Sequence, residues 1–133
     1  DRIDRVVPLP DRRYVEYKGD LNERFEDIVG VTLYDDRPVQ TILFWVSDRS
    51  KDYVATKPIH DSQKHYRNEK EAELRRQYPT LEGGAFFSID CIENYELIRE
   101  LTSFGADLVV LSPEEVRYSV ILRIEEIYQA YHV

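Results

Sequence analysis

The side chains that could do chemistry gather in one stretch of the chain, between residues 57 and 67. The candidates share a polar or cationic head group: Lys57, His60, Ser62, Gln63, Lys64 and Arg67. Lysine and arginine supply positive charge, and a glutamine amide can pair with a base edge or a sugar hydroxyl. One interpretation is therefore a polar, cationic rim that an anionic effector could reach.

The same stretch has a structural interpretation, which the sequence leaves open. It lies where a predicted helix gives way to a strand, and the backbone groups of such a corner need hydrogen-bond partners. Ser62 and Gln63 could satisfy those groups, while His60 packs and donates one hydrogen bond. The basic run from residue 49 to residue 67 could likewise be a solvated edge of the domain.

Other kinds of site find little support. His60 and His65 are five residues apart, which on a strand points them to opposite faces, and Cys91 has no partner cysteine, so we expect no metal site. Cys91 lies among alternating apolar residues, a position typical of an inert buried thiol. Gly83-Gly84 lacks the Lys-Ser/Thr that a phosphate-binding loop requires. We therefore expect no catalytic residue, no cofactor and no enzyme activity.

Size and composition narrow the class of protein. A chain of 133 residues makes one domain, and a net charge of −8 argues against duplex nucleic acid as the partner of this segment itself. A single cysteine excludes an intrachain disulfide and suits a reducing compartment, so we expect a cytoplasmic location. No apolar run approaches the ~18 residues of a membrane span, and we expect no membrane partner.

Four strands are predicted. Residues 39–46 are apolar on both faces, which places this strand in the middle of a sheet with something packed on each side. Residues 85–92 form a strand with one apolar face and one mixed face, and residues 108–111 are a short apolar run typical of a buried strand. A further strand is predicted over residues 59–66.

Helices are predicted between and after these strands. Ser47 or Asp48 is predicted to cap a short helix that runs through Ala55, with Tyr53 and Val54 turned inward. Residues 68–78 are rich in charged helix formers and predict an exposed helix. We further predict a short helix over residues 21–28 and a long one from Glu114 to about Tyr131. The long helix carries an apolar stripe: Val116, Val120, Ile124, Ile127 and Tyr131.

The remaining helix boundaries carry clear signals. Asn94 can cap a helix that Gly105 ends, because glycine tolerates the left-handed conformation wanted there. Ser112, Pro113 and Glu115 predict a capping box at the start of the C-terminal helix, with Ser112 as the cap.

This order of elements predicts an α+β fold, a ferredoxin-like βαββαβ sandwich. It carries an N-terminal helix, an inserted helix over residues 68–78 and a long C-terminal helix. A sheet of this kind leaves one face open, which the C-terminal helix or a second copy of the chain could cover. We predict that residues 1–19 are the last strand of a preceding unit and a linker, and that residues 20–133 form the domain.

Four segments in this order resemble the C-terminal part of bacterial WYL-domain transcriptional regulators, the WCX region. Asp1-Arg2-Ile3 resembles the end of the WYL domain's final strand. Residues 25–31 resemble the helix-to-strand entry into the extension, residues 57–63 its P-x-H-x-S-Q signature, and residues 101–113 its closing section. An inserted helix followed by Gly83-Gly84 is similar to versions from Bacteroides-like bacteria.

The resemblance implies a regulator with an N-terminal winged helix-turn-helix that binds DNA, a WYL domain and this ferredoxin-like extension. It also implies a homodimer formed through the C-terminal half, and sensing of a nucleic-acid or nucleotide-like effector near the join of the last two domains. The WYL tripeptide and the DNA-reading helix do not occur in these 133 residues. The alternative is an ACT-like small-molecule sensor domain attached to a metabolic enzyme. An acylphosphatase-like hydrolase would need a phosphate loop that the sequence lacks.

Overall fold

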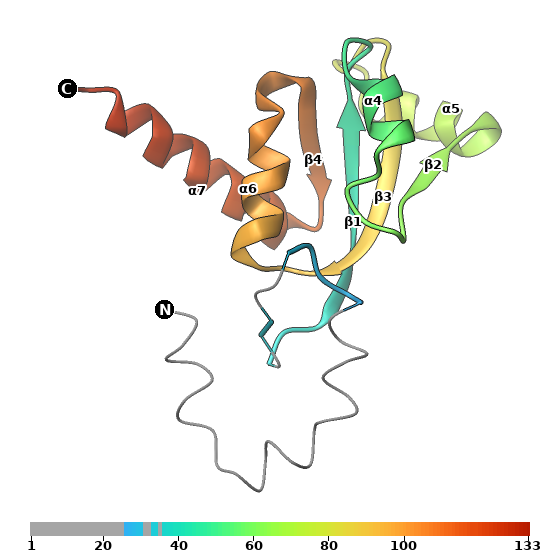
Figure 1. Ribbon diagram of the computed structural model, residues 1–133. Coiled ribbons are helices and arrows are strands. Elements are labelled where there is room, and N and C mark those ends of the chain that lie inside the picture. Colours follow the sequence, from blue (N-terminus) through green and yellow to red (C-terminus); the bar gives the residue numbers. More distant parts are fainter. Residues whose placement is uncertain (1–25, 31–32, 35) are drawn as a thin grey trace, which may run out of the picture.

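The computed structural model describes residues 26–30, 33–34 and 36–133. In this part of the chain four strands form one antiparallel sheet, in the order β2-β3-β1-β4 (Figure 1). The strands are β1 (Val39–Val46), β2 (Lys64–Tyr66), β3 (Ala85–Ile92) and β4 (Leu108–Ser112). Prediction and structure agree on the bounds of β1 and β3, and β4 is one residue longer than predicted.

The central position predicted for β1 is confirmed. It lies between β3 and β4, and it pairs with β3 along its whole length, from Val39 opposite Ile92 to Val46 opposite Ala85. A strand in this position has no free edge, and the part of β1 from Ile42 to Val46 is buried or half-buried on both faces, which agrees with the apolar residues on both sides of it.

Within the described residues, four α-helices accompany the sheet. They are α4 (Lys51–Thr56), α5 (Asn68–Gln77), α6 (Tyr95–Ser103) and α7 (Glu114–Ala130). The short α4 connects β1 to β2 and α6 connects β3 to β4, and both lie over the same face of the sheet (Figure 1). The inserted helix predicted over residues 68–78 is α5, and it ends one residue earlier than predicted.

The main core lies between the sheet and the pair α4 and α6. Alternate residues of β1 and β3 point into it, and Phe44 and Phe87 stack there with ring centroids 5.7 Å apart. The helices contribute Val54 from α4 and Leu97 and Leu101 from α6, all of them buried. Each such side chain contributes about 1.5–3 kcal/mol to stability by leaving water.

The opposite face of the sheet is partly covered by α5. Leu74 of α5 packs with Trp45 and Phe86, and all three side chains are buried. Trp45 Nε1 donates to the carbonyl of Gly83 at 3.0 Å. Arg75 donates from its guanidinium to the carbonyls of Gly83 and Gly84 at 2.6 and 2.8 Å. The inserted helix is thus tied to the sheet by apolar contacts and, through the Arg75 side chain, by hydrogen bonds to the backbone just before β3.

Two predicted features of the first helix are wrong. Helix α4 begins at Lys51, directly after Ser50. The backbone carbonyl of Ser47 accepts from the N–H groups of Ser50 and Lys51, and the Ser47 hydroxyl donates to Asp107 at 2.7 Å. Ser47 therefore joins the helix to the loop before β4 and does not cap it. Val54 is buried as predicted, but Tyr53 is exposed, because adjacent residues of a helix point about 100° apart.

The predicted capping box of the last helix is also wrong. Pro113 occupies the N-cap position of α7, and no side chain caps the helix there. Ser112 is the last residue of β4 and pairs with Leu43, so the sheet holds it out of the capping position. The other two signals are confirmed: Asn94 accepts from the N–H of Leu97 at 2.8 Å, and Gly105 has a φ of +59°.

The strand predicted over residues 59–66 begins only at Lys64, since the residues before it form a turn in which the Gln63 N–H donates to the His60 carbonyl at 3.0 Å. The helix predicted over residues 21–28 lies largely outside the described residues, and residues 26–30 are a turn and bend. The division predicted between residues 19 and 20 also lies outside them.

Two glycines allow a sharp test of the packing around β1. Gly84 has a φ of +66°, and a Cβ there would lie 2.3 Å from the carbonyl oxygen of Val46 and 2.6 Å from Nε1 of Trp45. Gly105 has a similar φ of +59°, but a Cβ at that position would have nothing within 4 Å. Gly105→Ala should therefore cost only the strain of the left-handed backbone, about 1–2 kcal/mol. Gly84→Ala should cost more than twice as much.

Urea unfolding followed by the fluorescence of the single tryptophan, Trp45, measures both values. Equal losses in the two variants would show that Gly84 has room for a side chain and that the close approach to β1 is wrong.

Candidate functional site: the corner before β2 and the free half of α7

Three of the predicted site residues meet in the loop between α4 and β2. His60 Nε2 lies 2.7 Å from the carbonyl oxygen of Glu26, and Nδ1 lies 2.8 Å from the Ser62 hydroxyl. Because a carbonyl oxygen only accepts, Nε2 is the donor, and Nδ1 is left to accept from Ser62. His60 thus fastens the corner to the segment before β1.

Ser62 also extends the hydrogen bonding of the sheet. The pairing of β2 with β3 ends at Lys64 opposite Ser88, and the N–H of Asp90 lies beyond the end of that ladder. The Ser62 hydroxyl accepts from this N–H at 2.7 Å. A side chain here replaces the missing strand partner, which is why the shorter β2 leaves no orphan donor at this point.

Gln63 completes the corner. Its amide nitrogen donates to the carbonyl of Val54 at 3.0 Å, near the end of α4, and its amide oxygen accepts from the N–H of Ile59 at 3.0 Å. The contacts of His60, Ser62 and Gln63 are those of the structural interpretation, in which the polar side chains satisfy backbone groups.

The three cations of the predicted site are exposed, and the structure does not bring them to one point. Lys57 follows α4, with Nζ 5.9 Å from the ring centroid of Tyr53. Lys64 pairs with Ser88 and shares its face of the sheet, whereas His65 lies on the other face against Phe87, with ring centroids 4.6 Å apart. Arg67 donates to Nδ1 of His65 at 3.0 Å. Lys64 and Arg67 thus flank the two faces of the edge strand β2.

His65 is a member of this edge that sequence reasoning considered only as a metal ligand. The ring of His65 is partly shielded from water against Phe87, which lowers the pKa of His65 below its ordinary value, and the positive charge of Arg67 lowers it further. The neutral imidazole is therefore favoured, which leaves Nδ1 free to accept from the guanidinium. The alternation of β2 could have revealed this pairing, because it places residues 65 and 67 on the same side.

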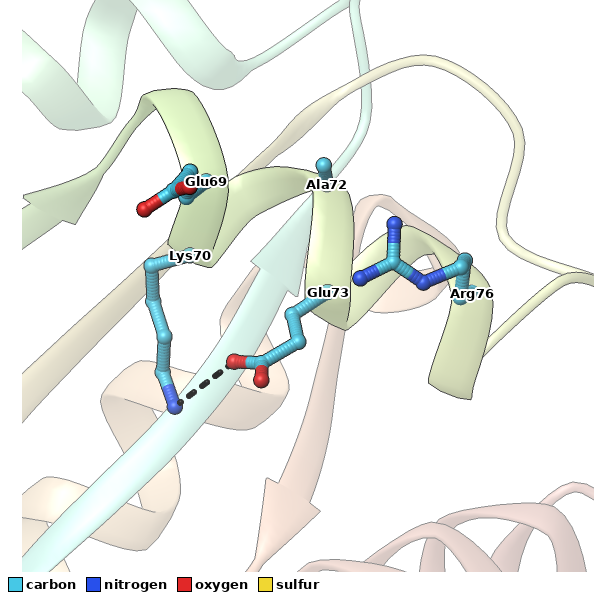
Figure 2. A pocket seen from close by; sticks show the side chains of 5 residues that line it. All are labelled: Glu69, Lys70, Ala72, Glu73 and Arg76. Carbon is cyan, nitrogen blue, oxygen red and sulfur yellow. Dashed lines mark ion pairs between the residues drawn. The ribbon is translucent and has the colours of Figure 1, made fainter.

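A hollow of about 500 Å³ lies over the outer face of α5 (Figure 2). It is lined by Glu69, Lys70, Ala72, Glu73 and Arg76. Lys70 and Glu73 form an exposed ion pair at 3.6 Å, and every lining residue comes from this single helix. A binding pocket needs an apolar wall with a few convergent polar groups, so this hollow is a solvated helix surface and not a ligand site.

Cys91 is buried in the main core, as predicted. Burial raises the pKa of its thiol to about 12, with smaller contributions from the charges of Asp90 and Asp27. Among residues 26–30, 33–34 and 36–133, no three histidine, cysteine or acidic side chains are grouped so as to hold a metal ion. No helix in the same described ranges is long and apolar enough to cross a membrane.

The structure differs most from expectation in α7. Only Val116 of the predicted stripe is buried, and Val120 is half-buried against the main core. The helix contacts α6 and β4 near its start and then runs away from the sheet (Figure 1). It therefore does not cover the open face of the sheet, and the second half of its apolar stripe faces solvent. A period of 3.6 residues shows which side of a helix is apolar but not what lies opposite.

The domain belongs to the class with a four-stranded antiparallel sheet, helices on both faces and an appended C-terminal helix. The family model of the WCX domain matches residues 38–128, which includes all four strands and most of α7. The chain belongs to the WCX domain family, the C-terminal region of WYL-type regulators that its sequence resembles. A search of curated proteins found no match.

Removing the Ser62 hydroxyl tests whether the corner is structural. Ser62→Ala leaves the Asp90 N–H without an acceptor, so the free energy of unfolding should fall by about 1–3 kcal/mol. Ser103→Ala is the matched control, because its hydroxyl donates to a carbonyl at the exposed end of α6 and its loss should stay within about 0.5 kcal/mol. Equal values in urea unfolding would contradict the role of Ser62.

The state of the Cys91 thiol gives a second test. A pKa of about 12 leaves almost no thiolate at pH 8, and burial blocks access, so the folded protein should not react with a disulfide reagent such as DTNB. The same protein in denaturant should release one equivalent of the coloured thiolate. Rapid labelling of the folded protein would place Cys91 at a reactive, accessible site.

Proposed function

We propose that this chain is a regulatory and dimerisation module of a cytoplasmic, DNA-binding transcriptional regulator of the WYL type. In this proposal the module assists the sensing of a nucleic-acid or nucleotide-like effector, and a winged helix-turn-helix elsewhere in the regulator binds the operator. The observation that carries the proposal is the match of the WCX domain over residues 38–128. The module performs no catalytic step and needs no cofactor.

The arrangement of the sheet supports a ferredoxin-like sandwich for this module. The strand order β2-β3-β1-β4 is antiparallel throughout, and β1 and β3 are the central pair. Two βαβ units, β1-α4-β2 and β3-α6-β4, place their helices on one face. The helix α5 is then an insertion and α7 an extension of that framework.

The polar corner supports a division of labour within the predicted effector site. The side-chain groups of His60, Ser62 and Gln63 are engaged by backbone and by one another, so these residues shape the loop. The exposed cations then make the contacts with an anionic effector: Lys57, Lys64 and Arg67. A net charge of −8 makes such a cationic edge the favourable place for an anion to approach.

Because the family match is to the WCX domain, the alternative of an ACT-like sensor attached to a metabolic enzyme is not proposed. Such a sensor would use the same kind of sheet, and a fold alone does not determine a function.

Charge reversal at the edge strand tests effector contact in the regulator that carries this module together with its WYL domain. Lys64→Glu with Arg67→Glu should weaken binding of a fluorescein-labelled single-stranded oligonucleotide by about tenfold or more, measured by fluorescence anisotropy. Loss of two phosphate contacts should also lower the slope of log K against log salt by about 1.4, that is, about 0.7 per contact.

Lys70→Glu with Arg76→Glu is the matched control, because it makes the same change in net charge on the solvated face of α5 (Figure 2). Affinity and salt dependence that stay the same in the Lys64 and Arg67 variant, or that fall equally in the control, would remove the edge of β2 as the effector contact.

A further inference from the structure

The second half of α7 presents an apolar stripe that is exposed in the described part of the chain, where the ring of Tyr128 meets that of His132 at the end of the same segment. Its members are Ile124, Ile127, Tyr128 and Tyr131, with exposed fractions of 51%, 39%, 65% and 81%. Their spacing of i, i+3, i+4 and i+7 puts all four on one side of the helix. Figure 1 shows this half of α7 extending away from the sheet and its helices.

This stripe continues a side of the helix that is already buried. Val116 is fully buried and Val120 half-buried on the same side of α7, and the exposed members follow without a break. A helical segment of about ten residues is marginal in water unless an amphipathic face packs against something. Four large apolar side chains on such a segment therefore indicate a partner.

We propose that the partner is the same helix of a second copy of this chain, packed antiparallel to the first. This inference rests on the dimerisation in the proposed function and assigns it a surface and an orientation. The seam consists of Val120, Ile124, Ile127 and Tyr131, whose spacings are 4, 3 and 4, as in the a and d positions of a coiled coil.

The spacing of the seam fits a second copy. A pattern of 4, 3 and 4 is the same in both directions, so a two-fold axis brings the seam onto itself. Ile124 then lies opposite Ile127 of the second copy, and Val120 lies opposite Tyr131 of the second copy. In this register the two domains lie at opposite ends of the helix pair, because each is attached at the start of its own α7.

Charge along the helix agrees with the antiparallel orientation. No basic residue lies in the last turn of α7, and its Tyr128 carbonyl is 3.0 Å from Nδ1 of His132, so the carbonyl end carries the partial negative charge of a helix C-terminus with no lysine or arginine beside it. Arg123 forms an ion pair with Glu126 of its own helix at 3.3 Å, and the antiparallel register also places it beside the last turn of the second copy, where a positive charge is favourable. A parallel pair would set the two carbonyl ends side by side.

Other features argue against a membrane surface as the occupant. The helix carries Glu114, Glu115, Glu125 and Glu126, whereas helices that lie on anionic membranes have a basic polar face.

A contact of only three helical turns is at the small end of protein interfaces, below about 1,200 Å² in total. We therefore expect a dimer with a dissociation constant in the micromolar range.

Analytical ultracentrifugation of the 133-residue chain tests the surface. Ile127→Asp should weaken the dimer by at least about 100-fold, since it puts a carboxylate in the middle of the seam. Leu122→Asp is the matched control: Leu122 is 41% exposed against 39% for Ile127, but it points to the opposite side of α7. The control should dimerise like the unchanged chain. Both substitutions are at exposed positions, so circular dichroism should show both variants folded.

Disulfide formation tests the orientation. An equimolar mixture of Ile124→Cys and Ile127→Cys chains should oxidise to the mixed dimer in preference to either variant alone, because position 124 lies opposite position 127. Cys91 is buried and does not compete. Preferential cross-linking of each variant to itself would indicate parallel helices and overturn the proposal.

The outcomes separate this inference from the proposed function. A dimer that survives Ile127→Asp overturns the α7 seam and leaves dimerisation through another surface. A monomer at every concentration up to about 1 mM overturns the seam and the dimerisation together, since a micromolar dimer would be almost complete there. Neither result changes the oligonucleotide experiment at the edge of β2, which tests effector contact separately.

Discussion

The antiparallel pairing of β1 with β3 is the interaction on which the rest of the structure depends. These two eight-residue strands are paired over their full length at the centre of the sheet, and each places buried apolar side chains on both faces. Helices α4 and α6 pack on one face of the sheet, over the stacked rings of Phe44 and Phe87. The other face receives α5 through Trp45 and Phe86. Because a single pair of strands anchors both layers, a change at their junction, such as a side chain at Gly84, is felt on both sides of the sheet.

The two edges of the sheet are completed in different ways. At one edge β2 has only three residues, and Ser62 replaces the missing strand by accepting the N–H of Asp90 through its side chain. At the other edge β4 packs against the beginning of α7, which then leaves the domain. A short edge strand with charged residues also resists pairing with another sheet, so Lys64 has a protective role whether or not it binds an effector. The charge-reversal experiment is therefore designed around affinity and salt dependence and not around stability.

The sequence was sufficient to predict β1, β3, nearly all of β4 and the order of the elements, because long apolar patterns report directly on burial, whereas only the last three residues of the strand predicted over residues 59–66 form β2. It predicted the Asn94 cap and the Gly105 end of α6, where the signal is local and nothing competes with it. It failed for Ser47 and Ser112, whose hydrogen bonds go to Asp107 and to the sheet, respectively. Those partners are 60 and 69 residues away in sequence. The corner of His60, Ser62 and Gln63 was predicted as a set, but its contact with Asp90 depends on where β2 ends, which no local pattern records.

The apolar stripe of α7 shows why a sequence pattern and a surface have to be considered together. The pattern is the same along the helix from Val116 to Tyr131, yet the first part is buried by α6 and β4 while the last part is exposed. A continuous stripe with two environments is expected when one helix serves its own domain at one end and a partner at the other. Its 4, 3 and 4 spacing restricts that partner further, because a seam that repeats in reverse fits a two-fold axis without a second, different surface. Dimerisation and folding of this module would then share one helix, and a substitution near Val120 would affect both.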